Sequence, residues 1–193
     1  MLDMKECIAS GEPWMPSAER DVLARALAGC RAYLEYGAGG STVLALRLGV
    51  PEVITVESDP ACLALVQAAF RSRPDGTSFL PVLITDGVKG GGPRPEYALA
   101  PWRALAAGNG RMPELILIDG RFRVACFLAC LVWGRPGTTL LFDDYFDRPA
   151  YRVAERFCPV TARHGRMAVF HLSRILDPLE VKVHLFMQSG DRR

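Results

Sequence analysis

Two features of this 193-residue sequence, a glycine-rich stretch and a single acidic residue, are of a kind that could bind a nucleotide-like ligand. The first is Glu35-Tyr36-Gly37-Ala38-Gly39-Gly40-Ser41-Thr42, a glycine-rich turn that begins with an acidic residue. Glycines in such a turn let the backbone bend tightly and approach a ligand without a Cβ atom in the way. The second is Glu57, about 20 residues beyond Gly37, at a spacing where a carboxylate can bind ribose hydroxyl groups. Together they predict a site for a nucleotide or nucleoside.

The composition of the turn narrows the choice of ligand. Thr42 stands where the dinucleotide fingerprint G-x-G-x-x-G has its third glycine, which argues against NAD. Glu35 places a carboxylate beside the turn, where it would repel an anionic pyrophosphate and attract a cationic amino-acid or sulfonium group. The turn therefore favours S-adenosylmethionine over NAD.

Three further acids, Asp119, Asp143 and Asp144, follow two other β-like runs. Neighbouring strand ends would bring the three carboxylates together, where they would repel one another unless a cation offsets them. Clusters of oxygen ligands suit magnesium, calcium or manganese, which makes these three acids candidate metal ligands. The alternatives are a metal-free acceptor site, or acids that are paired with Arg121 and Arg123. The two arginines could instead bind an anionic acceptor, since the N–H groups of a guanidinium can donate to both oxygens of a carboxylate or phosphate.

The elements that must position these residues alternate between β-like runs and helical patterns, which predicts an α/β fold with a doubly wound, mostly parallel sheet. Strands are expected at 32–36, 53–57, 79–85, 115–118, 139–142, 160–163 and 167–172. Helices are expected at 18–28, 42–48, after Asp59-Pro60, and at 97–107, 124–133 and 148–157. Ser17 is the expected cap of the first helix, and His164-Gly165 the expected two-residue turn of a closing hairpin. The segment from Asp177-Pro178 fits a helix or a strand equally well.

Length and composition limit the kind of protein. The length predicts a single domain over 1–193, with 1–30 as an N-terminal segment and helix that could act as a lid. A net charge of +2 is too small for general binding to a nucleic-acid backbone, and no basic stripe with interleaved aromatics is present. The apolar run 124–133 is too short to cross a bilayer, and the acidic N-terminus lacks a signal-peptide core. We therefore expect a cytoplasmic protein without a nucleic-acid or membrane partner; a homo-oligomer is compatible with the sequence.

The six cysteines are scattered and form no C-x-x-C motif. In a reducing compartment such residues are expected to behave as small buried hydrophobes rather than as disulfides or zinc ligands.

The stretches LEYGAGGST, VITVESDP, ITDG, LILIDG and LLFDDY resemble, in order and spacing, the motifs of class I S-adenosylmethionine-dependent methyltransferases. The resemblance extends over about 33–172 and implies a Rossmann-like, seven-stranded sheet that is mostly parallel, with an antiparallel closing strand. It also implies three groups of cofactor contacts: Glu35, Gly37, Gly39 and Ser41 around the methionine portion, Glu57 on the ribose, and Asp86 with Gly87 beside the adenine.

The acids after the fourth and fifth strands are similar to those of catechol-type O-methyltransferases, where they hold a divalent metal that orients the acceptor hydroxyl. Those enzymes carry a lysine base three residues beyond the first acid, and this chain has Phe122 there. The resemblance thus leaves open whether magnesium is used. It makes Asp119 and Asp144 the candidates for orienting or deprotonating the acceptor.

The implied function is methyl transfer from S-adenosylmethionine to a small molecule, at an oxygen or nitrogen atom. The alternatives are an aminopropyl transferase on a similar fold and a cofactor-binding module that has lost catalysis.

Several other residues could belong to the acceptor site. Trp14, Trp102 and Phe122 could form apolar walls of a pocket, although aromatic residues at such positions are more often core. His164 and His171 could act as bases. The glycine-rich loop 87–95 and the segment before Ser17 are candidate lids.

Overall fold

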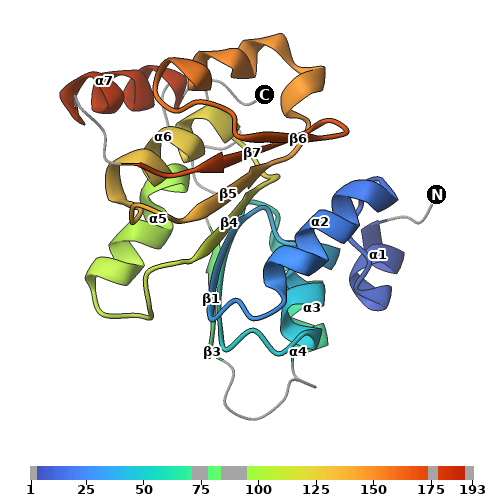
Figure 1. The fold of residues 1–193 in the computed structure, drawn as a ribbon. Coiled ribbons are helices and arrows are strands. Elements are labelled where there is room, and N and C mark those ends of the chain that lie inside the picture. Colours follow the sequence, from blue (N-terminus) through green and yellow to red (C-terminus); the bar gives the residue numbers. More distant parts are fainter. Residues whose placement is uncertain (1–3, 71–77, 84–94, 174–177, 190–193) are drawn as a thin grey trace.

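The centre of the fold is a seven-stranded sheet, seen in a computed structural model that describes residues 4–70, 78–83, 95–173 and 178–189. The strand order is β3-β2-β1-β4-β5-β7-β6 (Figure 1). The strands are β1 (Ala32–Tyr36), β2 (Glu52–Glu57), β3 (Ser78–Leu83), β4 (Leu115–Ile118), β5 (Thr139–Phe142), β6 (Ala162–His164) and β7 (Met167–His171). Only β7 runs against its neighbours β5 and β6, which confirms the predicted mostly parallel sheet with an antiparallel strand.

The central strands are buried on both faces, because helices cover the sheet on both sides. Successive side chains of a strand point to opposite faces, so β1 and β4 each supply two layers of core. Leu34 and Ile116 pack in the layer beneath α5 (Pro95–Ala106) and α6 (Arg123–Trp133), whereas Leu117 packs in the opposite layer.

The helices divide between these two layers (Figure 1). One side carries α1 (Met4–Ser10), α2 (Ser17–Leu27), α3 (Gly40–Arg47) and α4 (Pro60–Phe70). The other side carries α5, α6 and α7 (Pro178–Gln188), together with the 3-10 helices η1 (Tyr145–Asp147) and η2 (Pro149–Arg156). The ambiguous segment after Asp177-Pro178 is therefore helical where the structure describes it.

The N-terminal segment differs from the prediction. Helix α1 was not expected, because seven residues are too few to display a helical period. It is held by tertiary contacts: Ile8 is buried, and the Arg47 guanidinium donates to the carbonyls of Ala9 and Ser10 at the end of the helix. Ser17 was expected to cap α2, but it lies inside the helix, and no side-chain hydrogen bond caps α2 at Pro16.

The segment after β5 also departs from the prediction in detail. The helical stretch expected at 148–157 is 3-10 rather than α-helical, with hydrogen bonds that span three residues, such as Tyr151 N–H to the Arg148 carbonyl. The hairpin turn lies one residue later than expected, at Gly165-Arg166, since His164 already pairs with Met167. Gly165 has a φ of 59°, which suits glycine and lets the chain reverse there. The last two residues of the strand expected at 79–85 lie outside the described residues.

The sheet changes direction of growth between β1 and β4. The chain passes from β1 through β2 to β3 on one side and then returns to place β4 on the other side of β1. In open α/β sheets, ligands bind at this switch point, beyond the carboxyl ends of the strands. The loops that follow β1, β2, β4 and β5 therefore form the expected position of a site.

Two further findings concern the described residues as a whole. None of their helices is long and apolar enough to cross a membrane. All six cysteines are unbridged and buried, as expected for small hydrophobic residues.

Candidate functional site

A cavity of about 580 Å³ opens at the switch point. This volume lies within the range of small-molecule sites. The lining comes from the residues after four strands: Gly37–Ser41 after β1, Glu57–Asp59 at the end of β2, Asp119–Arg121 after β4, and Asp143 with Asp144 after β5. Cys7, Trp14, Cys62, Tyr97, Arg123 and Arg166 complete it.

The glycine-rich turn after β1 touches the turn after β4. Gly37 has a φ of 100°, and a Cβ atom at this residue would lie 2.8 Å from the backbone of Gly120. Gly37 is thus required for both its conformation and its close approach. A Cβ atom at Gly39 would meet nothing within 4 Å, and Gly39 lines the cavity. The missing side chain at Gly39 therefore leaves open space for a ligand.

Glu35 lies beneath this turn rather than in the cavity. Its carboxylate is fully buried on the α3 side of β1 and accepts hydrogen bonds from the hydroxyls of Ser41 and Thr42. Burial raises the pKa of Glu35 to about 7, against the lowering effect of these hydrogen bonds. Ser41 lines the cavity whereas Glu35 does not, so Glu35 is placed to hold the turn from behind.

Glu57 is held rigidly at the end of β2. One carboxylate oxygen, Oε2, accepts the N–H of Ala38 at 2.8 Å. The other oxygen, Oε1, accepts the N–H groups of Ser58 and Asp59, the latter at 2.8 Å. A carboxylate has about four acceptor positions, so Oε2 can still accept a hydroxyl group from a ligand in the cavity. Asp59 begins α4, as predicted, by accepting the N–H of Ala61 at 2.8 Å.

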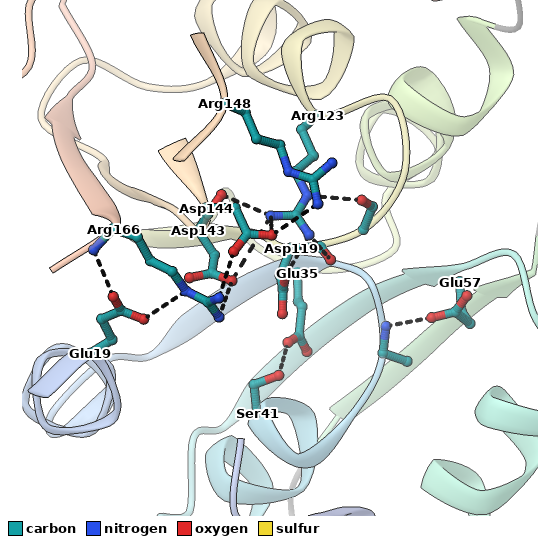
Figure 2. A network of polar contacts seen from close by, with 12 residues as sticks. Glu19, Glu35, Ser41, Glu57, Asp119, Arg123, Asp143, Asp144, Arg148 and Arg166 are labelled. Carbon is teal, nitrogen blue, oxygen red and sulfur yellow. Dashed lines mark hydrogen bonds and ion pairs between the residues drawn. The ribbon is translucent and has the colours of Figure 1, made fainter. Parts of the chain in front are cut away.

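The three aspartates after β4 and β5 come together around Arg123 (Figure 2). The guanidinium is 2.8 Å from Asp119, 3.2 Å from Asp144 and 3.9 Å from Asp143. It also donates to the carbonyl oxygens of Gly120, Asp119 and Asp143, and its side chain is only 10% exposed. Arg123 thus joins the ends of β4 and β5 as well as offsetting their charges.

A second guanidinium, Arg166, approaches the aspartates from the β6–β7 turn (Figure 2). It lies 3.0 Å from Asp144, 3.5 Å from Asp143 and 3.4 Å from Glu19 of α2, whose side chain is 1% exposed. The exposed Arg148 adds a contact of 3.4 Å to Asp144. These contacts tie α2 and the β6–β7 turn to the floor of the cavity.

The surroundings of Asp119 and Asp143 raise the pKa values of both carboxyl groups. Desolvation raises the pKa of Asp119 well above its usual value, and the charges of Asp143 and Asp144 raise it further, whereas Arg123 lowers it. Desolvation and the charge of Asp144 likewise raise the pKa of Asp143, against Arg166 and Arg123.

These residues do not fit a divalent metal. Arg123 and Arg166 point their N–H groups at the oxygens that would have to coordinate the ion (Figure 2). No group of three or more potential ligands with the arrangement of a metal site occurs in the part of the chain that the structure describes. Asp119, Asp143 and Asp144 form the arginine-paired cluster that the sequence offers as an alternative, and this arrangement gives no support to the three aspartates as metal ligands.

Two residues with an unusual backbone shape this cluster. Phe122 and Asp144 have φ values of 52° and 56°, which L-residues with bulky or branched side chains adopt rarely. Each lies just beyond the end of a strand, where the chain must turn sharply. In the first turn, Arg121 is exposed and lines the cavity, whereas the next arginine, Arg123, is buried against the aspartates.

The aromatic and histidine candidates for the acceptor pocket occupy different places in the structure. Trp14 lines the cavity with 58% of its surface exposed. Trp102 and Phe122 are core residues: the Trp102 Nε1–H donates to the Tyr36 hydroxyl, and Phe122 packs against a neighbouring tyrosine ring. His171 contacts Thr139 at the start of β5, on the edge of the sheet opposite the cavity.

No histidine lines the cavity among the residues described. Asp86 and Gly87 lie outside the described residues, as does the lid candidate 87–95 except for Pro95, the first residue of α5.

Sequence reasoning missed several residues of the site. Arg166 and Glu19 lie far from the aspartates in the sequence, and only the position of β7 beside β5 brings them in. Tyr97 donates its hydroxyl to the Val56 carbonyl at 3.3 Å and borders the cavity from α5.

A scan against protein-family models found no match, and a search of curated proteins found none either. Among solved structures, a methyltransferase-like protein of Silicibacter pomeroyi is 32% identical, with a TM-score of 0.78 over 93% of this chain and 97% of that one. An O-methyltransferase of Bacillus cereus in complex with SAH is 16% identical, with a TM-score of 0.56 over 85% of each chain. The tRNA methyltransferase TrmI of Aquifex aeolicus is 13% identical, with a TM-score of 0.54 over 91% of this chain and 77% of that one.

Proposed function

The chain belongs to the class I S-adenosylmethionine-dependent methyltransferases, and we propose that it methylates a small-molecule acceptor at an oxygen or nitrogen atom. The observation that carries the proposal is the meeting of the glycine-rich turn, Glu57 and Asp119 around one cavity at the switch point of the sheet. The O-methyltransferase from Bacillus cereus, whose structure is a complex with SAH, has this fold, which supports S-adenosylmethionine as the cofactor.

The cofactor would lie along the carboxyl ends of β1 and β2. Glu57 accepts hydrogen bonds from the ribose hydroxyls, since its carboxylate is already oriented by backbone N–H groups and keeps a free acceptor position. Gly37, Gly39 and Ser41 border the methionine portion, with Glu35 supporting Ser41 from behind. Asp86 and Gly87 remain the candidates for the adenine.

S-adenosylmethionine supplies a methyl group on a sulfonium, so the protein contributes mainly alignment and a suitable electric field. Asp119 is the candidate that contacts the acceptor, because its side chain lines the cavity and is 28% exposed there, where a carboxylate can accept a hydrogen bond or a proton. Asp144, 15% exposed and held by three arginines, helps to orient the acceptor.

The two alternatives differ in what they need from the aspartates. An aminopropyl transferase needs free carboxylates for a polyamine, and the three aspartates after β4 and β5 are already paired with arginines. A binding module without catalysis would keep the cofactor site and lack turnover. The tRNA methyltransferase among the similar structures makes RNA a third acceptor to test, but the net charge of +2 favours a small molecule.

The deciding experiment is calorimetric titration of S-adenosylhomocysteine, with NADH as a control ligand. Glu57→Ala should weaken binding at least about tenfold, because a charged hydrogen-bond acceptor is lost. Glu96→Ala is the matched control, since Glu96 is exposed on α5 and does not line the cavity. Equal binding by wild type and Glu57→Ala would contradict the assigned ribose contact, and no binding by wild type would contradict the proposed cofactor site. A screen of acceptors, including RNA, would follow.

A further inference from the structure

One guanidinium in the cavity has no acidic partner among the residues that the structure describes. Arg123 and Arg166 each lie within 4.0 Å of three carboxylates. Arg121 lines the same cavity and is exposed, but no carboxylate in 4–70, 78–83, 95–173 or 178–189 forms an ion pair with it. Its positive charge is therefore available to a ligand.

The position of Arg121 is fixed by the core on which its turn rests. The next residue, Phe122, is 1% exposed, packs against Tyr97 with ring centroids 5.7 Å apart, and has a φ of 52°. The carbonyl of Arg121 accepts a hydrogen bond from the Cys126 thiol at 3.4 Å. A backbone held in this way reduces the ordering cost when the side chain binds a ligand.

We propose that Arg121 binds an oxyanion of the acceptor, a carboxylate or a phosphate group, so that the enzyme selects acceptors that carry one; this inference rests on the proposed function. A guanidinium offers paired N–H donors that match the two oxygens of such a group. Asp119 lies two residues earlier in the same turn and also lines the cavity. An acceptor can thus place its anionic group on Arg121 and its hydroxyl or amine beside Asp119.

The carboxylate of the cofactor is the other oxyanion that could reach this cavity. It has its own donors, because the first residues of α3, Gly40 and Ser41, line the cavity and the N-terminus of a helix attracts anions. Gly120 contacts the glycine-rich turn at Gly37, and Arg121 follows Gly120 one residue further along the chain. The acceptor is therefore assigned to Arg121, and the experiment separates the two sources.

The test measures binding of benzoate, phenyl phosphate and neutral benzamide to protein saturated with S-adenosylhomocysteine. These probes carry a ring that can contact the exposed indole of Trp14 at the cavity. For wild type, we expect at least one of the anions to bind about tenfold more tightly than benzamide. Arg121→Gln should abolish this preference, and Arg121→Lys should keep part of it. Arg103→Gln is the matched control, because Arg103 is exposed on α5 away from the cavity and should leave the preference unchanged.

Each outcome bears on the inference in a different way. No binding of S-adenosylhomocysteine to wild type would overturn the proposed function and this inference with it. Intact cofactor binding, with anions no tighter than benzamide or with Arg121→Gln unchanged, would overturn only this inference. In a third outcome, Arg121→Gln would bind S-adenosylhomocysteine more weakly but bind 5′-methylthioadenosine, which lacks the amino-acid portion, as wild type does. This outcome would assign Arg121 to the carboxylate of the cofactor and would also overturn the inference.

Discussion

Replacing Glu35 with glutamine tests whether a buried carboxylate beneath the glycine-rich turn limits stability at neutral pH. Glu35 is fully buried, and desolvation raises its pKa from the ordinary 4.5 to about 7. At about 1.4 kcal/mol for each pH unit between these values, the ionised carboxylate costs the folded chain about 3 kcal/mol. Glutamine resembles the protonated acid in shape and still accepts one hydroxyl hydrogen bond, from Ser41 or Thr42.

The sign of the pH dependence follows from the raised pKa. Below about pH 4.5, Glu35 is protonated in the folded and the unfolded chain and contributes no pH dependence. Between about pH 4.5 and 7 only the unfolded chain ionises, so the folded state of wild type loses stability as the pH rises. Above about pH 7 the full cost of about 3 kcal/mol is present.

The assay is urea denaturation of wild type and Glu35→Gln at half-unit steps from about pH 5 to 8.5. We expect the free energy of unfolding of the variant, relative to wild type, to rise with pH and to level off above about pH 7. Subtracting the two curves removes the titration of Asp119 and Asp143, which both proteins share. Glu96→Gln, a replacement at an exposed residue of α5, is the matched control. A difference between wild type and Glu35→Gln that does not change with pH would refute the reasoning.

The further predictions concern the arginine cluster and the glycine-rich turn. Arg123→Met should lower the free energy of unfolding by about 3–5 kcal/mol, because the Asp119 carboxylate loses its arginine partner and three carbonyl oxygens lose a donor. Arg148→Met should lower the free energy of unfolding by less than about 1 kcal/mol, because the Arg148 side chain is 46% exposed. Equal losses for the two variants in urea denaturation would contradict the larger role assigned to Arg123. Gly37→Ala should destabilise the fold by more than about 2 kcal/mol, since a Cβ atom would press on backbone at positive φ. Gly39→Ala should lower the free energy of unfolding by less than about 1 kcal/mol but weaken the binding of S-adenosylhomocysteine. A large loss of stability would contradict the open space beside Gly39. A chelator should leave the thermal midpoint and the cofactor affinity unchanged, because guanidinium groups face the aspartates; an increase of either on adding magnesium would contradict this arrangement.

The sheet could be predicted from the sequence because its signals are local. The run 115–118 is apolar throughout and 139–142 is apolar after Thr139, as expected of strands covered on both faces, and the structure has strands with the same bounds. Asp59-Pro60 likewise carries the information for the start of α4. Helix α1 depends instead on distant contacts from Arg47, which leave no local signal.

The site was predictable to the extent that it lies at strand ends. The sequence located the glycine-rich turn, Glu57 and the aspartates, because residues after parallel strands must share one edge of the sheet. It could not say which cation offsets the aspartates. That depends on Arg166, which reaches Asp143 and Asp144 only through the pairing of β7 with β5.

The pairing of the aspartates with arginines limits what the aspartates can do. A divalent ion would offset negative charge and keep an open position for the oxygen of an acceptor. Arg123 offsets charge as well, but it also donates to the carbonyls of Gly120, Asp119 and Asp143, so its N–H groups are used within the protein. The cluster can therefore fix the ends of β4 and β5 without binding the acceptor through the cation. On the proposals above, contact with the acceptor falls to groups that are accessible in the cavity: the partly exposed carboxylate of Asp119 for its nucleophile, and for its charge the guanidinium of Arg121, which has no acidic partner in the described part of the chain.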